Sequence, residues 1–155
     1  MKRLTFLVPL LALLLLAACG GGSDLPKVTF VNAQGQRTEL KVEVPRTKEG
    51  YFKGLMNRSS LPRDQGMFFV FPRGPHPGGF WMKDTQIPLT VAFVAEDGTI
   101  ADIQDMQPLS QDIHNTPKEY LYGLEANLGW FQDHGIKVGD KVILGDLADL
   151  PSPLQ

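Results

Sequence analysis

The 155-residue sequence predicts a mostly β fold, a single compact antiparallel β-barrel or sandwich with two short helices. Residues Arg37–Val44 alternate between apolar and charged side chains, which is typical of a strand with one buried and one solvated face. The run Met67–Phe71 is apolar throughout, as in a strand that is buried on both faces. Asp97-Gly98 separates two further strand-like segments and is the strongest hairpin signal in the chain.

The predicted strands are short and are separated by Gly, Pro, Asn and Asp residues, which favour turns. In chain order, the strands and strand-like segments are Lys27–Val31, Arg37–Val44, Gly66–Phe71, Phe80–Lys83, Leu89–Ala95, Thr99–Met106, Tyr120–Ala126 and Lys141–Leu144. Pro45 ends the second of them, because proline cannot donate to a strand ladder. No internal repeat or second-domain boundary interrupts the series, so one domain is expected.

Two short helices are expected between these strands. The first begins at Thr47, whose hydroxyl can accept a hydrogen bond from the first helical turn. Its apolar stripe consists of Tyr51, Phe52, Leu55 and Met56. The second is expected to be capped by Asn127 and to run through His134, with Gly135 as its C-terminal stop.

Residues 1–18 predict a secretory signal peptide that ends at a lipobox. Lys2 and Arg3 precede an apolar run from Leu4 to Leu16, and Leu-Ala-Ala stands directly before Cys19, the only cysteine. This arrangement resembles the bacterial lipobox, in which the thiol is alkylated with diacylglycerol and the chain is cut before the cysteine. A transmembrane anchor is the weaker interpretation, because spanning about 30 Å of hydrocarbon needs about 20 apolar residues and Pro9 interrupts this run.

The sequence therefore predicts an exported protein, anchored to a cell-envelope membrane through lipid at Cys19. Residues 19–26 form the lipidated cysteine and a flexible Gly-rich tether, residues 27–147 the β-rich domain, and residues 148–155 a tail. Gly20 is not the aspartate that often retains such lipoproteins at the inner membrane, so both the inner and the outer membrane stay open.

Charge and composition exclude several classes of partner. The formal net charge is −2, and the loss of Lys2 and Arg3 with the signal makes the remaining chain more acidic, so nucleic acid is not expected as a partner. Lipidation of Cys19 would leave no thiol for a zinc site or a nucleophile. His76, His114 and His134 have no paired metal-ligand spacing, so no metal or cofactor is expected.

Three blocks of the sequence resemble the domain-of-unknown-function 192 family. They are Gly54-Leu55-Met56-Asn57-Arg58 with Leu61 and Gly66–Phe71; Phe80-Trp81-Met82-Lys83-Asp84-Thr85 with Ile87-Pro88-Leu89; and Leu124-Glu125, Gly129, Gly135 and Val138-Gly139-Asp140. The resemblance implies a single β-rich domain, often exported, and no established activity. The family commonly has asparagine where this chain has Asp84, and aspartate where it has Thr90.

The candidate ligand-binding residues are Trp81, Lys83, Arg58, Glu125 and Asp84, which are expected to converge on one cleft. An indole beside an ammonium can hold a sugar, an anionic group or a peptide, but the same pair can be an ordinary exposed strand face. Arg58 can stabilise a helix C-terminus, bind a carboxylate ligand or pair with Glu125. A structural ion pair of Glu125 with Lys83 or Arg58 is the preferred interpretation, and catalysis would require a second carboxylate, for which Asp84 is the candidate.

These features favour a non-catalytic binding module for an envelope glycan, a small anion or a protein partner. The first alternative is a hydrolase-type enzyme that uses Glu125 or Asp84 as acid or base. The second alternative is a structural or assembly factor of the cell envelope. No residue is assigned a catalytic role, because the sequence contains no recognisable catalytic set.

The lipid anchor can be tested by replacing Cys19 with serine, which removes the thiol that would carry the diacylglycerol. The Cys19→Ser protein should lose processing at the lipobox and acyl labelling, so that it keeps residues 1–18 and the larger mass of the uncleaved chain. A variant that stayed processed and membrane-bound like the parent would exclude lipidation as the anchor.

Overall fold

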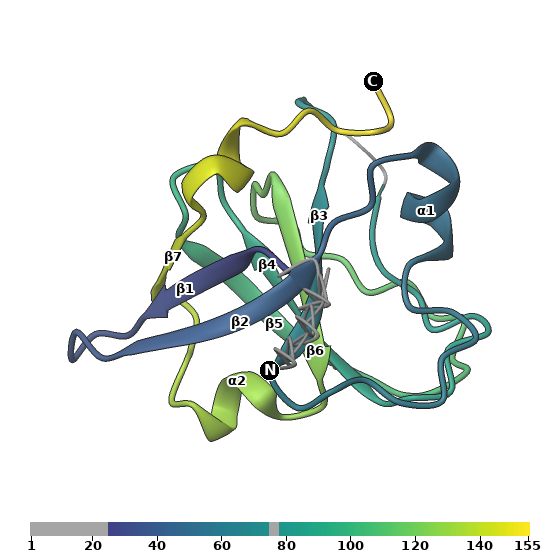
Figure 1. Cartoon of the computed structure of the whole chain (residues 1–155), viewed down its shortest axis with the longest axis horizontal. Helices are drawn as coiled ribbons and strands as arrows, with labels where there is room; N and C mark the ends of the chain where they lie inside the picture. The colour runs from purple at the N-terminus through teal and green to yellow at the C-terminus, as the bar shows by residue number, and fades with distance from the viewer. Residues whose placement is uncertain (1–24, 75–77) are drawn as a thin grey trace, which may run out of the picture.

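A seven-stranded mixed β-sheet organises the protein in the computed structural model, which describes residues 25–74 and 78–155 (Figure 1). The predicted signal peptide, Cys19, most of the tether and His76 lie outside the described residues and stay predictions. Within the described residues, every helix is too short or too polar to cross a membrane.

The sheet is built from strands of three to seven residues. They are β1 (Lys27–Val31), β2 (Arg37–Glu43), β3 (Gln65–Val70), β4 (Leu89–Val94), β5 (Ile100–Met106), β6 (Tyr122–Asn127) and β7 (Lys141–Ile143). The helices are α1 (Lys48–Lys53) and α2 (Trp130–Asp133), and a 3₁₀ helix, η1, covers Gly145–Asp149. The mostly β class and the two short helices agree with the sequence-based prediction.

The strand order is β5-β4-β6-β3-β2-β1-β7, and the sheet is mixed rather than antiparallel. All neighbouring pairs are antiparallel except β2 and β3, which run parallel, with Val42 opposite Gly66. The purely antiparallel prediction is therefore wrong. After β2 the chain passes through α1 and a long loop before it enters β3, and such a crossover permits parallel pairing.

The barrel alternative is also wrong, because the sheet does not close. The start of β5 meets the segment at β7 through the isolated bridge between Thr99 and Lys141 and a few backbone hydrogen bonds beside it, but the two edge strands form no ladder. β7 is only three residues long, so the contact with the start of β5 stays short. The sheet remains open and curled, with residues packed against both of its faces.

The central strands β3, β6 and β4 are buried on both faces, because side chains alternate along a strand. On one face, the first core includes Phe30, Leu40, Phe68, Val70, Ala92, Tyr122, Leu124, Trp130 and Phe131. On the other face, the second core includes Leu55, Leu61, Met67, Phe69, Phe71, Phe80, Met82, Leu89, Val91 and Phe93. This second core packs under α1 and the segments around Leu61 and Phe80, which gives the fold its layered, sandwich-like form.

The second face of β6 carries Gly123 and Glu125, two residues apart in the strand. A Cβ atom at Gly123 would lie 2.4 Å from Cζ of Phe80, so only glycine lets that ring rest directly on the sheet. Glu125 lies opposite Met67 of β3 and Val91 of β4, which are both buried and apolar. The strand register thus places a carboxyl inside an apolar layer.

The ends of the helices show where local sequence signals hold. Thr47 caps α1 as predicted, and its Oγ1 accepts a hydrogen bond from the amide of Gly50 at 3.1 Å. The prediction that Asn127 caps α2 is wrong, since that helix begins after Gly129. The Asn127 side-chain amide instead donates to the carbonyl oxygens of residues 61, 62 and 63 at 3.1–3.3 Å. It therefore ties the loop before β3 to the end of β6.

Candidate functional site

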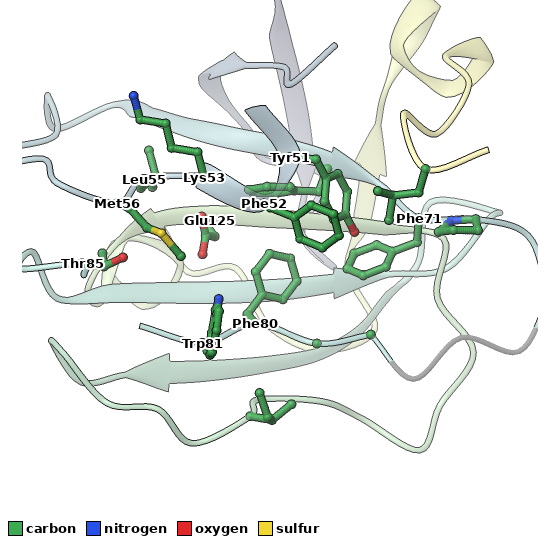
Figure 2. Close-up of a pocket in the computed structure, with 17 residues that line it drawn as sticks. Tyr51, Phe52, Lys53, Leu55, Met56, Phe71, Phe80, Trp81, Thr85 and Glu125 are labelled. Carbon is green, nitrogen blue, oxygen red and sulfur yellow. The ribbon is translucent and has the colours of Figure 1, made fainter. Parts of the chain in front are cut away.

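A pocket of about 470 Å³ opens on the second face of the sheet, between α1, the segment around Phe80 and the central strands (Figure 2). Its lining is mostly aromatic and aliphatic. The residues are Tyr51, Phe52, Lys53, Gly54, Leu55, Met56, Phe69, Phe71, Pro72, Gly78, Gly79, Phe80, Trp81, Thr85, Ile113, Glu125 and Leu154. Among these, Glu125 is the one acidic residue.

Glu125 lines this pocket as a buried carboxyl that receives no hydrogen bond from the described part of the chain. Its side chain is 5% exposed, and it accepts no hydrogen bond from any residue in the described ranges. Figure 2 shows the carboxyl between Met56 on one side and the rings of Phe52 and Phe80 on the other. Buried polar groups are nearly always paired, so an unpaired carboxyl facing a pocket is an exception that calls for an explanation.

Burial raises the pKa of the Glu125 carboxyl to about 8, and the positive charge of Arg58 opposes this rise only in part. Desolvation penalises the ionised form, because the strand neighbours and the pocket walls supply few dipoles to replace water. The carboxyl is therefore mainly protonated at neutral pH and ionises when a favourable partner comes near.

The predicted ion pair of Glu125 with Arg58 or Lys83 is wrong, because other groups engage both cations. The guanidinium of Arg58 donates two hydrogen bonds to the carboxylate of Glu43, at 2.6 and 2.7 Å. This bidentate pair lowers the pKa of Glu43. The ammonium of Lys83 lies over the indole of Trp81, 5.4 Å from the ring centroid.

Asp84 is held by the backbone rather than by the pocket. Its φ angle is +54°, a left-handed conformation that Asp and Asn tolerate better than most residues, and its carbonyl accepts from the amide of Asn57 at 2.7 Å. This backbone requirement explains why an asparagine or an aspartate suits the position. Asp84 is exposed and is absent from the pocket lining, so it does not supply a second carboxylate beside Glu125.

The structure brings two of the predicted site residues together. Trp81 and Glu125 line the same pocket, whereas Arg58, Lys83 and Asp84 do not. Trp81 is 41% exposed at the rim, while its neighbours Phe80 and Met82 are buried, in keeping with strand-like alternation. The roles of the five predicted residues in ligand binding stay predictions.

Sequence reasoning missed the aromatic wall that α1 supplies. Tyr51 packs edge-on against Phe69 and Phe71, at centroid distances of 5.4 and 5.9 Å, and burial raises its pKa, with further contributions from Tyr120 and Glu125. Phe52 and Ile113 remain exposed and, like Trp81, contribute apolar surface to the pocket. The apolar stripe of the predicted helix was the available signal, but a stripe alone does not separate a core residue from a pocket wall.

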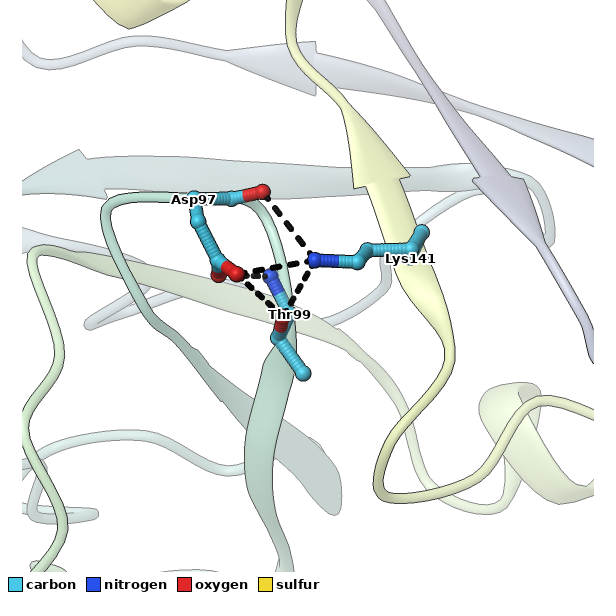
Figure 3. Close-up of polar contacts among 3 residues, drawn as sticks. All are labelled: Asp97, Thr99 and Lys141. Atoms are coloured by element: carbon cyan, nitrogen blue, oxygen red, sulfur yellow. Dashed lines mark hydrogen bonds and ion pairs between the residues drawn. The ribbon is translucent and has the colours of Figure 1, made fainter.

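A second carboxyl with a strongly shifted pKa, Asp97, has a structural explanation (Figure 3). The ammonium of Lys141 lies 2.9 Å from its Oδ2, and the hydroxyl and amide of Thr99 donate to it. Lys141 first and Thr99 second hold the pKa of Asp97 well below its usual range. These exposed contacts fasten the β4–β5 turn to β7, so they belong to the fold and not to a binding site.

The chemistry that the pocket can perform is limited by its single carboxyl. Glycoside hydrolysis of the common two-carboxylate type needs a pair of acidic residues facing the scissile bond, and the lining holds one. Residues 25–74 and 78–155 contain no cluster of three or more His, Cys, Asp or Glu residues that could hold a metal ion. The arrangement is suited to holding a ligand by apolar contact and one proton-donating or negatively charged group.

A family model described as DUF192, an uncharacterised ACR, matches residues 29–144, which include every strand except the start of β1. The chain belongs to the DUF192 family. No curated protein matches it significantly. Membership agrees with the resemblance found in the sequence and carries no assigned activity.

Two crystal structures of similar proteins share the DUF192 fold of this chain. One is a Sinorhizobium meliloti protein described as a "putative transcription regulator", with 34% identity, a TM-score of 0.70, and coverage of 76% of this chain and 91% of that one. The other is a Novosphingobium aromaticivorans protein of unknown function, with 34% identity, a TM-score of 0.69, and coverage of 79% and 89%. These likenesses support the fold and leave the activity open.

The departure from the DUF192 pattern at Thr90 falls on the face opposite the pocket. Thr90 is buried in β4, where its hydroxyl donates to Asp105 at 2.7 Å and accepts from the amide of Gly129 at 2.9 Å. Its strand neighbour Val91 belongs to the second core, so alternation directs Thr90 away from Glu125. The hydroxyl therefore ties β5 and the start of α2 to β4.

The buried carboxyl predicts a specific pH dependence of stability. The pKa of Glu125 is about 8 in the folded chain, above its ordinary value of about 4.3, so the folded state holds this proton more tightly. Stability relative to a Glu125→Gln variant should therefore fall as pH rises, by up to about 1.4 kcal/mol per pH unit between these two values. Urea unfolding of both proteins from pH 5 to pH 9 measures the difference.

Glu119→Gln is the matched control, because Glu119 is an exposed glutamate outside the pocket. Its stability difference from the parent should stay nearly constant over the same range. A constant difference for Glu125→Gln as well would mean that the Glu125 carboxyl has an ordinary pKa.

Proposed function

We propose that the protein is an envelope-anchored, non-catalytic binding module whose ligand occupies the pocket at Glu125. The observation that carries this proposal is a buried carboxyl in a mostly apolar pocket, to which none of the residues that the structure describes donates a hydrogen bond. An unpaired buried polar group destabilises the fold by about 1–3 kcal/mol. A ligand that pairs with the carboxyl would offset this free-energy cost on binding, so a role in ligand binding explains why a carboxyl is buried at this position.

The lining favours a ligand with an apolar body and one polar group. A volume of about 470 Å³ suits a small organic molecule or an inserted side chain. A free glycan would need several hydrogen-bonding groups, and the aromatic walls offer few. A small anion would need an available cation inside the pocket. Arg58 is bound to Glu43, Lys83 does not line the pocket, and the ammonium of Lys53 is directed away from Glu125 (Figure 2). Of the three predicted classes, the pocket favours an inserted group of a partner protein, and its lining adds a small molecule with an apolar body as a further ligand class.

The lipid anchor completes the proposal. Acylation at Cys19 would hold the domain at a membrane surface of the cell envelope through the tether of residues 19–26. We do not propose the transcription-regulator role of the Sinorhizobium meliloti description for this chain, because an acidic exported domain is poorly suited to binding nucleic acid.

An enzyme is the second candidate, and the raised pKa of Glu125 is the observation that favours it. A carboxyl that titrates near neutrality can act as a general acid or base. The earlier choice of Asp84 as its partner is not retained, since Asp84 does not line the pocket. A structural or assembly role would instead rest on the exposed apolar residues Phe52, Trp81 and Ile113 around the pocket.

Binding of an uncharged aromatic probe, N-phenyl-1-naphthylamine, tests the pocket directly. Its fluorescence should rise with the full-length protein, and Trp81→Ala should weaken binding about two- to tenfold, because removal of a ring contact costs about 0.5–1.5 kcal/mol. Trp81 is 41% exposed, so this variant should remain folded by circular dichroism.

Leu128→Ala is the control, because Leu128 is 42% exposed and lies outside the pocket lining. It should bind the probe like the parent. Equal probe affinity of Trp81→Ala and the parent would place binding elsewhere and contradict the proposal.

A further inference from the structure

The pocket combines one unpartnered carboxyl with a ring of aromatic side chains. Tyr51, Phe52, Phe80 and Trp81 line the space around Glu125 (Figure 2). The face of an aromatic ring carries negative potential and attracts cations, most strongly when the cation is removed from water. A carboxylate adds a full negative charge at the same place. The two features together favour a positively charged, weakly hydrated ligand.

The charged groups around Glu125 leave this preference in place. Arg58, which follows α1, interacts with Glu125 at a distance, but Glu43 of β2 already neutralises it. Lys53 of α1 is exposed at the pocket wall, and Figure 2 shows its ammonium directed away from Glu125. Tyr51, also in α1, has a raised pKa and stays neutral near pH 7. The segment from Phe80 to Thr85 contributes no titratable side chain to the lining.

We propose that the pocket binds an organic ammonium cation, with Glu125 as its counter-ion and the surrounding aromatic rings as its walls. This inference rests on the proposed function, since it names the chemical class of the ligand in the same pocket. An ammonium that carries alkyl groups matches both parts of the lining: the alkyl groups contact the rings, and the charge meets the carboxylate.

Binding of such a cation is coupled to release of a proton. The Glu125 carboxyl is largely protonated near pH 7 in the empty pocket, and a cation favours its ionised form. The bound complex contains the carboxylate and the ammonium, and the proton goes to solvent. Affinity therefore increases with pH by up to about tenfold per unit until the carboxyl is ionised without ligand, near pH 8.

Choline and 3,3-dimethyl-1-butanol form a matched pair of probes, because they share a shape and differ in the positive charge. Calorimetry with the processed chain, residues 19–155 with Cys19→Ser, compares them at pH 6 and pH 8.5 without the lipid, without the signal segment and without titration of the ligand. At pH 8.5 choline should bind at least about tenfold more tightly than the alcohol, since a desolvated cation–π contact and a counter-ion act together. The preference should shrink at pH 6.

The Glu125→Gln variant should keep its affinity for the alcohol within about threefold, should lose most of the preference for choline, and should show no pH dependence. Glu119→Gln should behave like the parent. Equal binding of choline and the alcohol to the parent at pH 8.5 would overturn the ammonium proposal and leave the binding pocket intact. A protein that bound N-phenyl-1-naphthylamine but not choline would also overturn the ammonium proposal and leave the binding pocket intact. Failure of all three probes would contradict the proposed function as well.

A quaternary ammonium can come from solution or from a lipid headgroup, and vesicles distinguish the two sources. If the lipid headgroup is the ligand, the processed Cys19→Ser chain should bind phosphatidylcholine vesicles more strongly than phosphatidylglycerol vesicles. Free choline should then release the protein from the phosphatidylcholine vesicles. Tight binding of choline without any such retention would identify a free ammonium. If neither choline nor phosphatidylcholine vesicles bound the protein, the ammonium proposal would be wrong.

Discussion

The burial of one carboxyl on the central strand of the sheet is the constraint on which the site depends. Glu125 lies in β6, which is hydrogen-bonded to β3 on one side and to β4 on the other. Because both neighbours hold the strand in register, the side chain cannot turn to the opposite face without breaking two ladders. The carboxyl is thus kept in the second core, among Met67, Val91 and Phe80, where water cannot solvate it fully.

The segments that cover the second face form a pocket around this buried carboxyl. The parallel pairing of β2 and β3 requires a crossover, and that crossover carries α1 and Arg58 over the second face. Glu43, at the end of β2, binds the guanidinium and so prevents it from reaching Glu125. Gly123 lets Phe80 rest on the sheet beside the carboxyl and complete one wall. The same elements that bury Glu125 therefore leave it without a partner.

Local signals in the sequence predicted much of the fold. Alternation located the strands, and Thr47 marked the start of α1. The predicted division between the buried Phe80 and the exposed Trp81 is confirmed, although the strand-like segment is reduced to a single bridge between Phe80 and His114. The parallel β2–β3 pair, the open sheet and the partner of Arg58 were not predictable in this way. They depend on which distant segments meet, as the fifteen-residue separation of Glu43 and Arg58 illustrates. The aromatic wall was visible as an apolar stripe, but only the packing distinguishes a wall from a core.

Glu125 is protonated at neutral pH in the empty pocket, and the chemical shift of its carboxyl carbon measures this protonation directly. Titration of ¹³C-labelled protein by NMR, with Glu125→Gln to assign the resonance, should give a midpoint of about 8 for this residue. Saturation with choline should lower that midpoint, since a bound cation stabilises the carboxylate. A midpoint near the ordinary glutamate value of about 4.3, unchanged by choline, would show a solvated or paired carboxyl and would contradict the account.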